Sequence, residues 1–214
     1  MPDCAACDVY VCRTDRPDAA PENCPMRTSS DVVDTREAYA EPDVHELARH
    51  AALVESTGYC EWTRVEETMQ FARRLGVKRL GVAFCVGLRQ EARTLRRILE
   101  ANGFEVASVC CKTGSISKAH IGIRDDEQVR PGTFEPMCNP IAQARLLNDE
   151  GTGLNVVFGL CVGHDSLFIK HSEALVTCLV VKDRALAHNP IGALNCAYGY
   201  FNKALYQRHR PEVS

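Results

Sequence analysis

From about residue 77 onward, short apolar runs alternate with segments in which apolar residues recur every three or four positions. Short apolar runs predict buried strands, and the three-to-four-residue spacing predicts helices with one buried face. The predicted strands are residues 80–84, 104–109, 154–158 and 175–181. The predicted helices are residues 89–101, residues 141–149, a short helix near Ser166, and a final helix carrying Leu194, Tyr198, Phe201 and Leu205. Strands that alternate with helices pair in parallel, so we expect an α/β domain with a mostly parallel sheet and helices on both faces.

Two further helices are predicted before the first strand, from Val44 to Val54 and from Val65 to Leu75. Residues 1 to 43 are different, because they contain four cysteines and five prolines and almost no apolar periodicity. Packing alone cannot order such a segment. We therefore divide the chain into a small cysteine-rich metal-binding segment, residues 1–43, and an α/β domain, residues 44–214.

The α/β domain contains an internal sequence repeat. Three pairs of matching stretches occur in the same order: 84–87 with 160–163 (Phe-Cys-Val-Gly and Leu-Cys-Val-Gly), 109–112 with 179–182, and 138–141 with 188–191. This order predicts two duplicated half-domains, about 77–150 and 151–214. The competing explanation is reuse of helix-start chemistry, because asparagine caps followed by proline are common where helices begin.

Composition and charge exclude several classes of function. Apolar residues make up 45% of the chain and charged residues 25%, with a formal net charge of -3 and no run of lysine or arginine. Such a chain offers no basic surface for nucleic acid. No apolar stretch approaches the ~20 residues that span a bilayer, and the first residues do not resemble a signal peptide. We expect a cytoplasmic protein that binds neither nucleic acid nor membrane.

The twelve cysteines change the picture. A cytoplasmic chain does not rely on disulfides for stability, so metal binding or redox chemistry becomes the leading interpretation. Secreted disulfide scaffolds are typically shorter, carry a signal peptide and lack long helical patterns, which makes a disulfide framework the weaker alternative.

The first four cysteines form a dedicated site: Cys4, Cys7, Cys12 and Cys24 supply four thiolates to a segment with little else to fold around. Zinc and iron-sulfur clusters both accept four thiolates, and Pro25 directly after the last cysteine is typical of iron-sulfur ligand runs. The spacing resembles the 4Fe-4S domain of corrinoid iron-sulfur proteins, where C-x2-C-x4-C is followed by a more distant Cys-Pro; the last gap is shorter here. We expect a 4Fe-4S cluster at this site, with zinc as the alternative.

The whole chain is similar to an uncharacterised family of small, cysteine-rich prokaryotic proteins described as metal-binding. Besides the N-terminal site, the resemblance lies in residues 159–168 (Gly-Leu-Cys-Val-Gly-His-Asp-Ser-Leu-Phe) and 181–190 (Val-Lys-Asp-Arg-Ala-Leu-Ala-His-Asn-Pro). The resemblance implies metal binding and implies no activity.

A second group of cysteines lies where the predicted strands end and the helices begin. Its members are Cys85, Cys111, Cys138 and Cys161. The carboxyl ends of parallel strands meet at one edge of a sheet, so these thiols should converge and hold a second cluster. Buried apolar cysteines or a metal-free reactive thiol site are the alternatives. His164 is the candidate catalytic proton donor at this edge. The cysteines expected to be structural are Cys60, Cys178 and Cys196.

These features predict a redox protein in which the N-terminal cluster relays electrons to the second site, with an electron-transfer partner. The alternative is a non-catalytic zinc or soft-metal handling protein, a sensor or metallochaperone whose N-terminal zinc site is structural. A nucleotide-binding domain is disfavoured because no G-x-G-x-x-G or Walker glycine loop follows a strand. The patterns leave open whether the chain is an enzyme.

Overall fold

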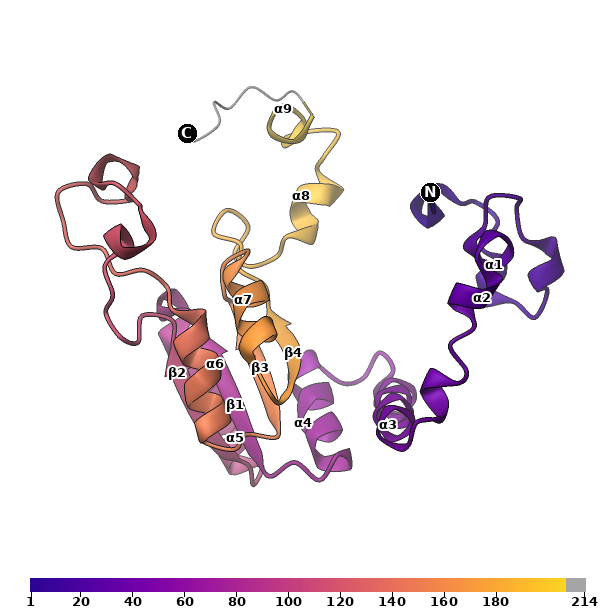
Figure 1. Ribbon diagram of the computed structural model, residues 1–214, viewed down its shortest axis with the longest axis horizontal. Helices are drawn as coiled ribbons and strands as arrows, with labels where there is room; N and C mark the ends of the chain where they lie inside the picture. The colour runs from indigo at the N-terminus through magenta and orange to yellow at the C-terminus, as the bar shows by residue number, and fades with distance from the viewer. Residues whose placement is uncertain (207–214) are drawn as a thin grey trace. The chain divides into compact units, whose positions relative to one another are not determined.

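The four strands predicted from the sequence form one parallel sheet in the computed structural model, which describes residues 1–206. The strands are β1 (Arg79–Phe84), β2 (Glu105–Cys110), β3 (Leu154–Phe158) and β4 (Leu175–Val180), in the order β2-β1-β3-β4. All three neighbouring pairs are parallel. The expected α/β fold with a parallel sheet is confirmed (Figure 1).

The chain divides into two units, Met1–Thr57 and Gly58–Ser214. The first unit contains four short 3-10 helices: Cys4–Ala6, Val11–Arg13, Pro17–Ala19 and Ala38–Ala40. It also contains helices α1 (Pro25–Thr28), α2 (Ser30–Val33) and most of α3 (Pro42–Gly58). Within residues 1–57, the buried apolar side chains are those of Val11, Ala20 and Val54. So small a set cannot form a core that would order this unit by itself.

The second unit holds the sheet and the helices that cover it. Its helices are α4 (Arg64–Arg74), α5 (Arg89–Ala101), α6 (Pro140–Asp149), α7 (His164–His171), α8 (Ile191–Asn195) and α9 (Asn202–Leu205). Short 3-10 turns occupy Val86–Leu88, Lys118–Ile121 and Asp125–Glu127. The single final helix predicted from the sequence is wrong: two short helices stand there. Leu194 and Tyr198 are 68% and 88% exposed, so the apolar residues that predicted one continuous helix are not buried against the rest of the domain.

The two faces of the sheet carry separate cores because alternate residues of each strand point to opposite faces. Leu80 and Val82 pack on one face against α4 and α5. Ala83 and Val157 pack on the other face against α6 and α7. At Gly81, a Cβ atom would lie 1.9 Å from Oδ1 of the buried Asn155, so this close approach of two strands requires glycine. Helices on both faces agree with the sequence prediction.

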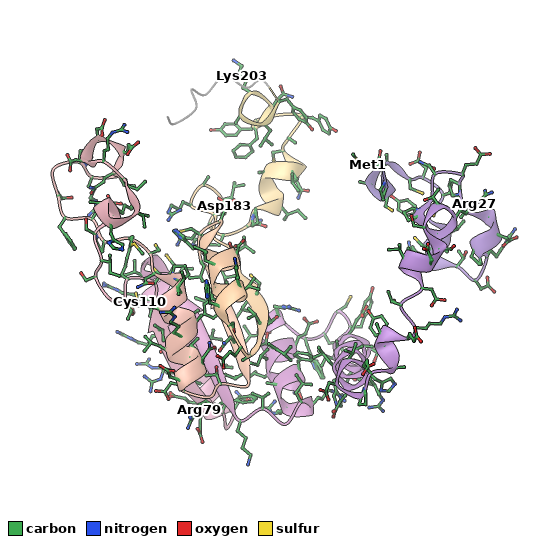
Figure 2. The ribbon with its side chains drawn as sticks, in the orientation of Figure 1. Met1, Arg27, Arg79, Cys110, Asp183 and Lys203 are labelled. Carbon is green, nitrogen blue, oxygen red and sulfur yellow. The ribbon has the colours of Figure 1, made fainter. Side chains whose placement is uncertain are left out.

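The strand order places a topological switch point at one edge of the sheet. The chain leaves β1 through α5 toward β2, whereas it leaves β3 through α7 toward β4 on the opposite face. The connections that follow the neighbouring strands β1 and β3 therefore cross opposite faces of the sheet and lead to opposite sides of it. The carboxyl ends of these two strands flank a topological switch point. Open α/β sheets bind ligands at this position. Figure 2 marks the carboxyl edge by Cys110 and the amino-terminal edge by Arg79.

Within residues 1–206, none of the helices has the length and apolar character needed to cross a membrane.

Candidate functional site

Three cysteines and one histidine gather at the carboxyl edge of the sheet, and we name Cys85, Cys111, Cys138 and His164 the edge cluster. Cys85 and Cys111 owe their positions to strand register. Phe84 of β1 pairs with Cys110 of β2, so the next residues of the two strands, Cys85 and Cys111, are also neighbours. The Cys111 amide donates to the Phe84 carbonyl over 2.9 Å, which extends the ladder to the cluster.

Cys138 is brought to the cluster by the connection between β2 and α6. This connection folds back on itself: the Met137 amide donates to the Ile116 carbonyl over 2.7 Å, and Lys118 forms an ion pair with Glu135. The Asn139 amide then donates to the Cys111 carbonyl over 2.7 Å. As a result, the Sγ atoms of Cys111 and Cys138 lie 3.9 Å apart, in hydrogen-bonding contact.

His164 reaches the cluster from the first turn of α7. Gly163, with φ of 82°, supplies the left-handed residue that turns the chain from β3 into this helix. The imidazole hydrogen-bonds Cys138, and this contact raises the pKa of His164. The cation is therefore favoured beside the Cys138 sulfur.

The three thiols of the edge cluster differ in pKa. The hydrogen bond between Cys138 and Cys111, followed by that between Cys138 and His164, lowers the pKa of Cys138 to about 3. Contact with Cys111 also lowers the pKa of Cys85 to about 5, with smaller contributions from the Gly87 amide and Lys182, against the opposing effect of burial. The pKa of Cys111 is raised, first by its contact with Cys138 and then by that with Cys85. These pKa shifts favour a thiol at Cys111 between thiolates at Cys85 and Cys138, although the Val86 amide donates to the Cys111 sulfur over 3.3 Å and opposes the rise of its pKa.

Cys161, the fourth cysteine expected at this edge, lies on the turn after β3. Its Sγ accepts a hydrogen bond from Nη2 of Arg184 over 3.1 Å. The same arginine interacts electrostatically with Cys85 and Cys138, so Cys161 and the edge cluster share one cation. Across residues 1–206, no three histidine, cysteine or acidic side chains are grouped in a way that could hold a metal ion.

Three of the four N-terminal cysteines share one small cavity. Cys4, Cys7 and Cys24 line a space of about 30 Å³ together with Asp3, Pro21, Asn23 and Pro25. Cys12 is exposed on the 3-10 helix Val11–Arg13 and is not among the lining residues. The three cysteines expected to be structural, Cys60, Cys178 and Cys196, are exposed, so burial in the core does not account for them. For Cys178 the reason is its place on β4, which is an edge strand of the sheet.

The sequence pattern missed two side chains that shape the site, Gln143 and Arg184. Gln143 is fully buried on α6, and its Nε2 donates to the carbonyls of Phe84 and Val109 over 3.2 and 2.7 Å, at the ends of β1 and β2. A glutamine among the apolar positions of the predicted helix 141–149 was the available signal. Arg184 lies in an aperiodic stretch that offered none.

The comparisons with known proteins place the chain in a family. The family model described as "Protein of unknown function (DUF1847)" matches residues 24–179, a range that includes the whole edge cluster. The "Uncharacterized protein MJ0455" of Methanocaldococcus jannaschii is 39% identical over 202 residues, covering 94% of this chain and 97% of that protein. No solved structure matches. The expected membership of an uncharacterised family is confirmed, while the metal binding described for it stays a prediction. The chain belongs to the DUF1847 family of proteins of unknown function.

Proposed function

We propose that the chain is a redox protein whose working centre is the edge cluster, with Cys111 and Cys138 as a reversible dithiol pair. The observation that carries the proposal is the 3.9 Å contact between their Sγ atoms. The hydrogen bond from the Asn139 amide to the Cys111 carbonyl fixes the two backbone segments directly beside these thiols. A disulfide between them then needs side-chain rotation rather than backbone rearrangement.

Burial assigns different roles to the two sulfurs. Cys138 is half-buried and Cys111 is buried, so an incoming disulfide meets Cys138 first. The Cys138 thiolate attacks a small disulfide, forms a mixed disulfide and expels a thiolate, which takes a proton from the His164 imidazolium. Cys111 then attacks Cys138, and its proton leaves with the second thiol. The protein gives up two electrons, and the small disulfide is reduced to two thiols.

Metal binding is the second candidate function, favoured by the donor types of the same cluster. Its side chains would have to close around the ion, because no three of them are grouped to hold a metal among residues 1–206. Three cysteines and one histidine form a common zinc set. Two thiolates on one tetrahedral zinc, each with a Zn–S bond of ~2.3 Å, stand about 3.8 Å apart, which is close to the Cys111–Cys138 spacing. The His164 imidazole contacts Cys138, so its neutral form would offer a nitrogen ligand to an ion held by that thiolate.

The N-terminal segment extends both candidates. Because Cys4, Cys7 and Cys24 line one cavity, we propose that this segment takes up metal, with Cys12 as the fourth ligand. A 4Fe-4S cluster there would relay electrons to the edge cluster through an electron-transfer partner or directly. A zinc ion would make the segment a structural part of a soft-metal handling protein.

One anaerobic experiment separates the two candidates. The purified full-length chain is analysed for iron, zinc and acid-labile sulfide, then reduced and treated with oxidised glutathione, and its disulfides are mapped by peptide mass spectrometry. The redox function predicts a Cys111–Cys138 linkage that dithiothreitol reverses and that Cys60→Ser, a change at an exposed cysteine, leaves intact. Stoichiometric metal that is lost in Cys111→Ala, with no linkage formed, would favour the metal site. A folded, metal-free protein without that linkage would refute the proposal for this cluster.

A further inference from the structure

Cys111 lies 3.9 Å from Cys138 between Sγ atoms and is the strand neighbour of Cys85, and the dithiol pair uses only the first of these two thiols. The remaining partner, Cys85, is 6% exposed, and Cys111 is 1% exposed, so these two sulfurs lie deeper than Cys138. A buried thiol in contact with the resolving cysteine of a dithiol pair is positioned for a second exchange step.

We infer that Cys85 is a third participating thiol, which attacks the Cys111–Cys138 disulfide at Cys111 and moves it to Cys85–Cys111. This inference rests on the proposed redox function and adds an inward relay to it. The Cys85 sulfur forms a bond to the Cys111 sulfur, the Cys111–Cys138 bond breaks, and Cys138 leaves as a thiolate. The step needs no outside electrons or protons, because one disulfide replaces another.

The backbone geometry allows both disulfides. Cys85 and Cys111 follow the registered pair Phe84 and Cys110 on adjacent parallel strands. Neighbouring strands lie ~4.8 Å apart, which is within the ~4.4–6.8 Å range of Cα separations that disulfides bridge. The Cys111 amide still donates to the Phe84 carbonyl over 2.9 Å, so this spacing persists beyond the last strand residue.

Both ends of the exchange carry groups that assist it. The Cys85 sulfur accepts a hydrogen bond from the Gly87 amide and interacts with the Lys182 ammonium, which supports the attacking thiolate. The departing Cys138 sulfur hydrogen-bonds His164 and interacts electrostatically with Lys112, and these positive charges stabilise the thiolate that leaves. Thiol–disulfide exchange is fastest when the leaving thiolate is stabilised in this way.

The relay would store the oxidised pair beneath the surface and return Cys138 to its reactive form. The chain could then meet a second disulfide at Cys138 while the first oxidation is held by two buried side chains. The half-buried Cys138 therefore exchanges with disulfides in solution, and the buried Cys85 and Cys111 hold the resulting disulfide.

The test follows disulfide positions in time. The full-length protein carries Cys110→Ser, because adjacent cysteines at 110 and 111 would blur peptide assignments. The reduced protein is mixed anaerobically with one equivalent of oxidised glutathione, quenched with acid and N-ethylmaleimide at intervals, and mapped. The Cys111–Cys138 linkage should appear first and decline as Cys85–Cys111 grows, while Cys138 becomes alkylatable again.

Variants give the relay its controls. Cys85→Ser should stop at Cys111–Cys138, and Cys138→Ser should slow the appearance of Cys85–Cys111 at least about tenfold, since the more accessible thiol is missing. Cys60→Ser should behave as the parent.

Persistence of Cys111–Cys138 with Cys85 still alkylatable would overturn the relay and leave the proposed dithiol function standing. Formation of Cys85–Cys111 at the parental rate in Cys138→Ser would also overturn it. If neither linkage nor a mixed disulfide at Cys138 forms, the proposed function itself fails. Should Cys85→Ser not fold, the time course of the parent decides the question.

Discussion

Chemically identical thiols in this chain differ because their neighbours differ. Cys138 hydrogen-bonds Cys111 and His164 and interacts electrostatically with Lys112, and its pKa is lowered to about 3, whereas the pKa of Cys111 is raised. A thiolate reacts with electrophiles and a thiol does not, so these shifts become differences in reactivity at a given pH.

The alkylation rate of Cys138 should be nearly independent of pH from about pH 5 to pH 8. With its pKa lowered to about 3, the sulfur is already a thiolate throughout that window, and its reactivity falls only as the pH drops toward that value. An ordinary thiol gains about tenfold in rate per pH unit below its pKa of ~8.5. The measurement is iodoacetamide labelling at each pH, resolved by peptide mass spectrometry.

Two variants define the cause of this pH profile. His164→Ala removes a hydrogen bond that lowers the Cys138 pKa, so the pH at which labelling declines should move upward. His120→Ala changes an exposed histidine of a 3-10 turn and should leave the profile unchanged. A parental rate that climbs steadily from pH 5 to pH 8 would contradict the assigned thiolate.

At the scale of elements, α6 fastens the carboxyl ends of β1 and β2 through a single buried amide. Gln143 donates to the carbonyls of Phe84 and Val109, directly before Cys85 and shortly before Cys111. Gln143→Leu removes this donor, while the Phe84 carbonyl keeps the Cys111 amide, so the change should lower the free energy of unfolding by about 0.5–1.5 kcal/mol. Urea unfolding measures the change, with Gln90→Leu at an exposed position of α5 as the matched control. Equal stability of the two variants would show that the amide does not fasten the strands.

Helix α4 begins with a reciprocal cap that can be tested separately. The Glu66 amide donates to Oγ1 of Thr63 over 3.4 Å, and the Thr63 amide donates to the Glu66 carboxylate over 2.8 Å. Thr63→Ala should destabilise the fold by about 0.5–2 kcal/mol, as measured by thermal or urea unfolding. Thr94→Ala, within α5, lacks a capping role and should cost much less. A loss in Thr94→Ala that equals the loss in Thr63→Ala would contradict the cap.

Element boundaries followed from the sequence where burial enforces a period, and failed where it does not. The run 80–84 became β1 at Arg79–Phe84, and the run 154–158 became β3 with the same bounds, because both strands are covered on two faces. The final helix was mispredicted because Leu194 and Tyr198 have the spacing of a buried face but are largely exposed. The spacing of apolar residues shows which face of an element could be buried, and packing against the rest of the fold decides whether that face is buried.

At the scale of the whole molecule, the site was predictable in part for a related reason. Strand ends follow from strand periodicity, so the meeting of Cys85 and Cys111 could be expected from the sequence. The contacts of Cys138 with His164 and of Cys161 with Arg184 depend on the connection 112–139 and the turn 181–190. These segments are ordered by specific hydrogen bonds such as that from Met137 to Ile116, which leave no periodic trace in the sequence.

The division into two units predicts how the chain tolerates truncation. A fragment starting at Gly58 retains the sheet, its covering helices and the edge cluster. It should unfold cooperatively and form the same cluster disulfides as the full-length chain. The complementary fragment of residues 1–57 lacks a substantial core and should become ordered only with metal, which circular dichroism during zinc titration or cluster reconstitution would follow. A fragment from Gly58 that unfolds without cooperativity would show that the first unit contributes to the core.

The strand order also has a consequence for the chain as it is synthesised. The β1–α5–β2 portion is complete once Cys110 has emerged, but β1 is a central strand whose other neighbour is β3. The 43 residues between Cys110 and Leu154 must be added first, which takes roughly 2–9 s at ~5–20 residues per second. During that interval the β1 edge bearing Leu80 and Val82 is open, and an open apolar strand edge is a template for pairing with another nascent chain. Ribosomes that follow one another closely on the same message would therefore present this chain with its greatest risk of aggregation before folding is complete.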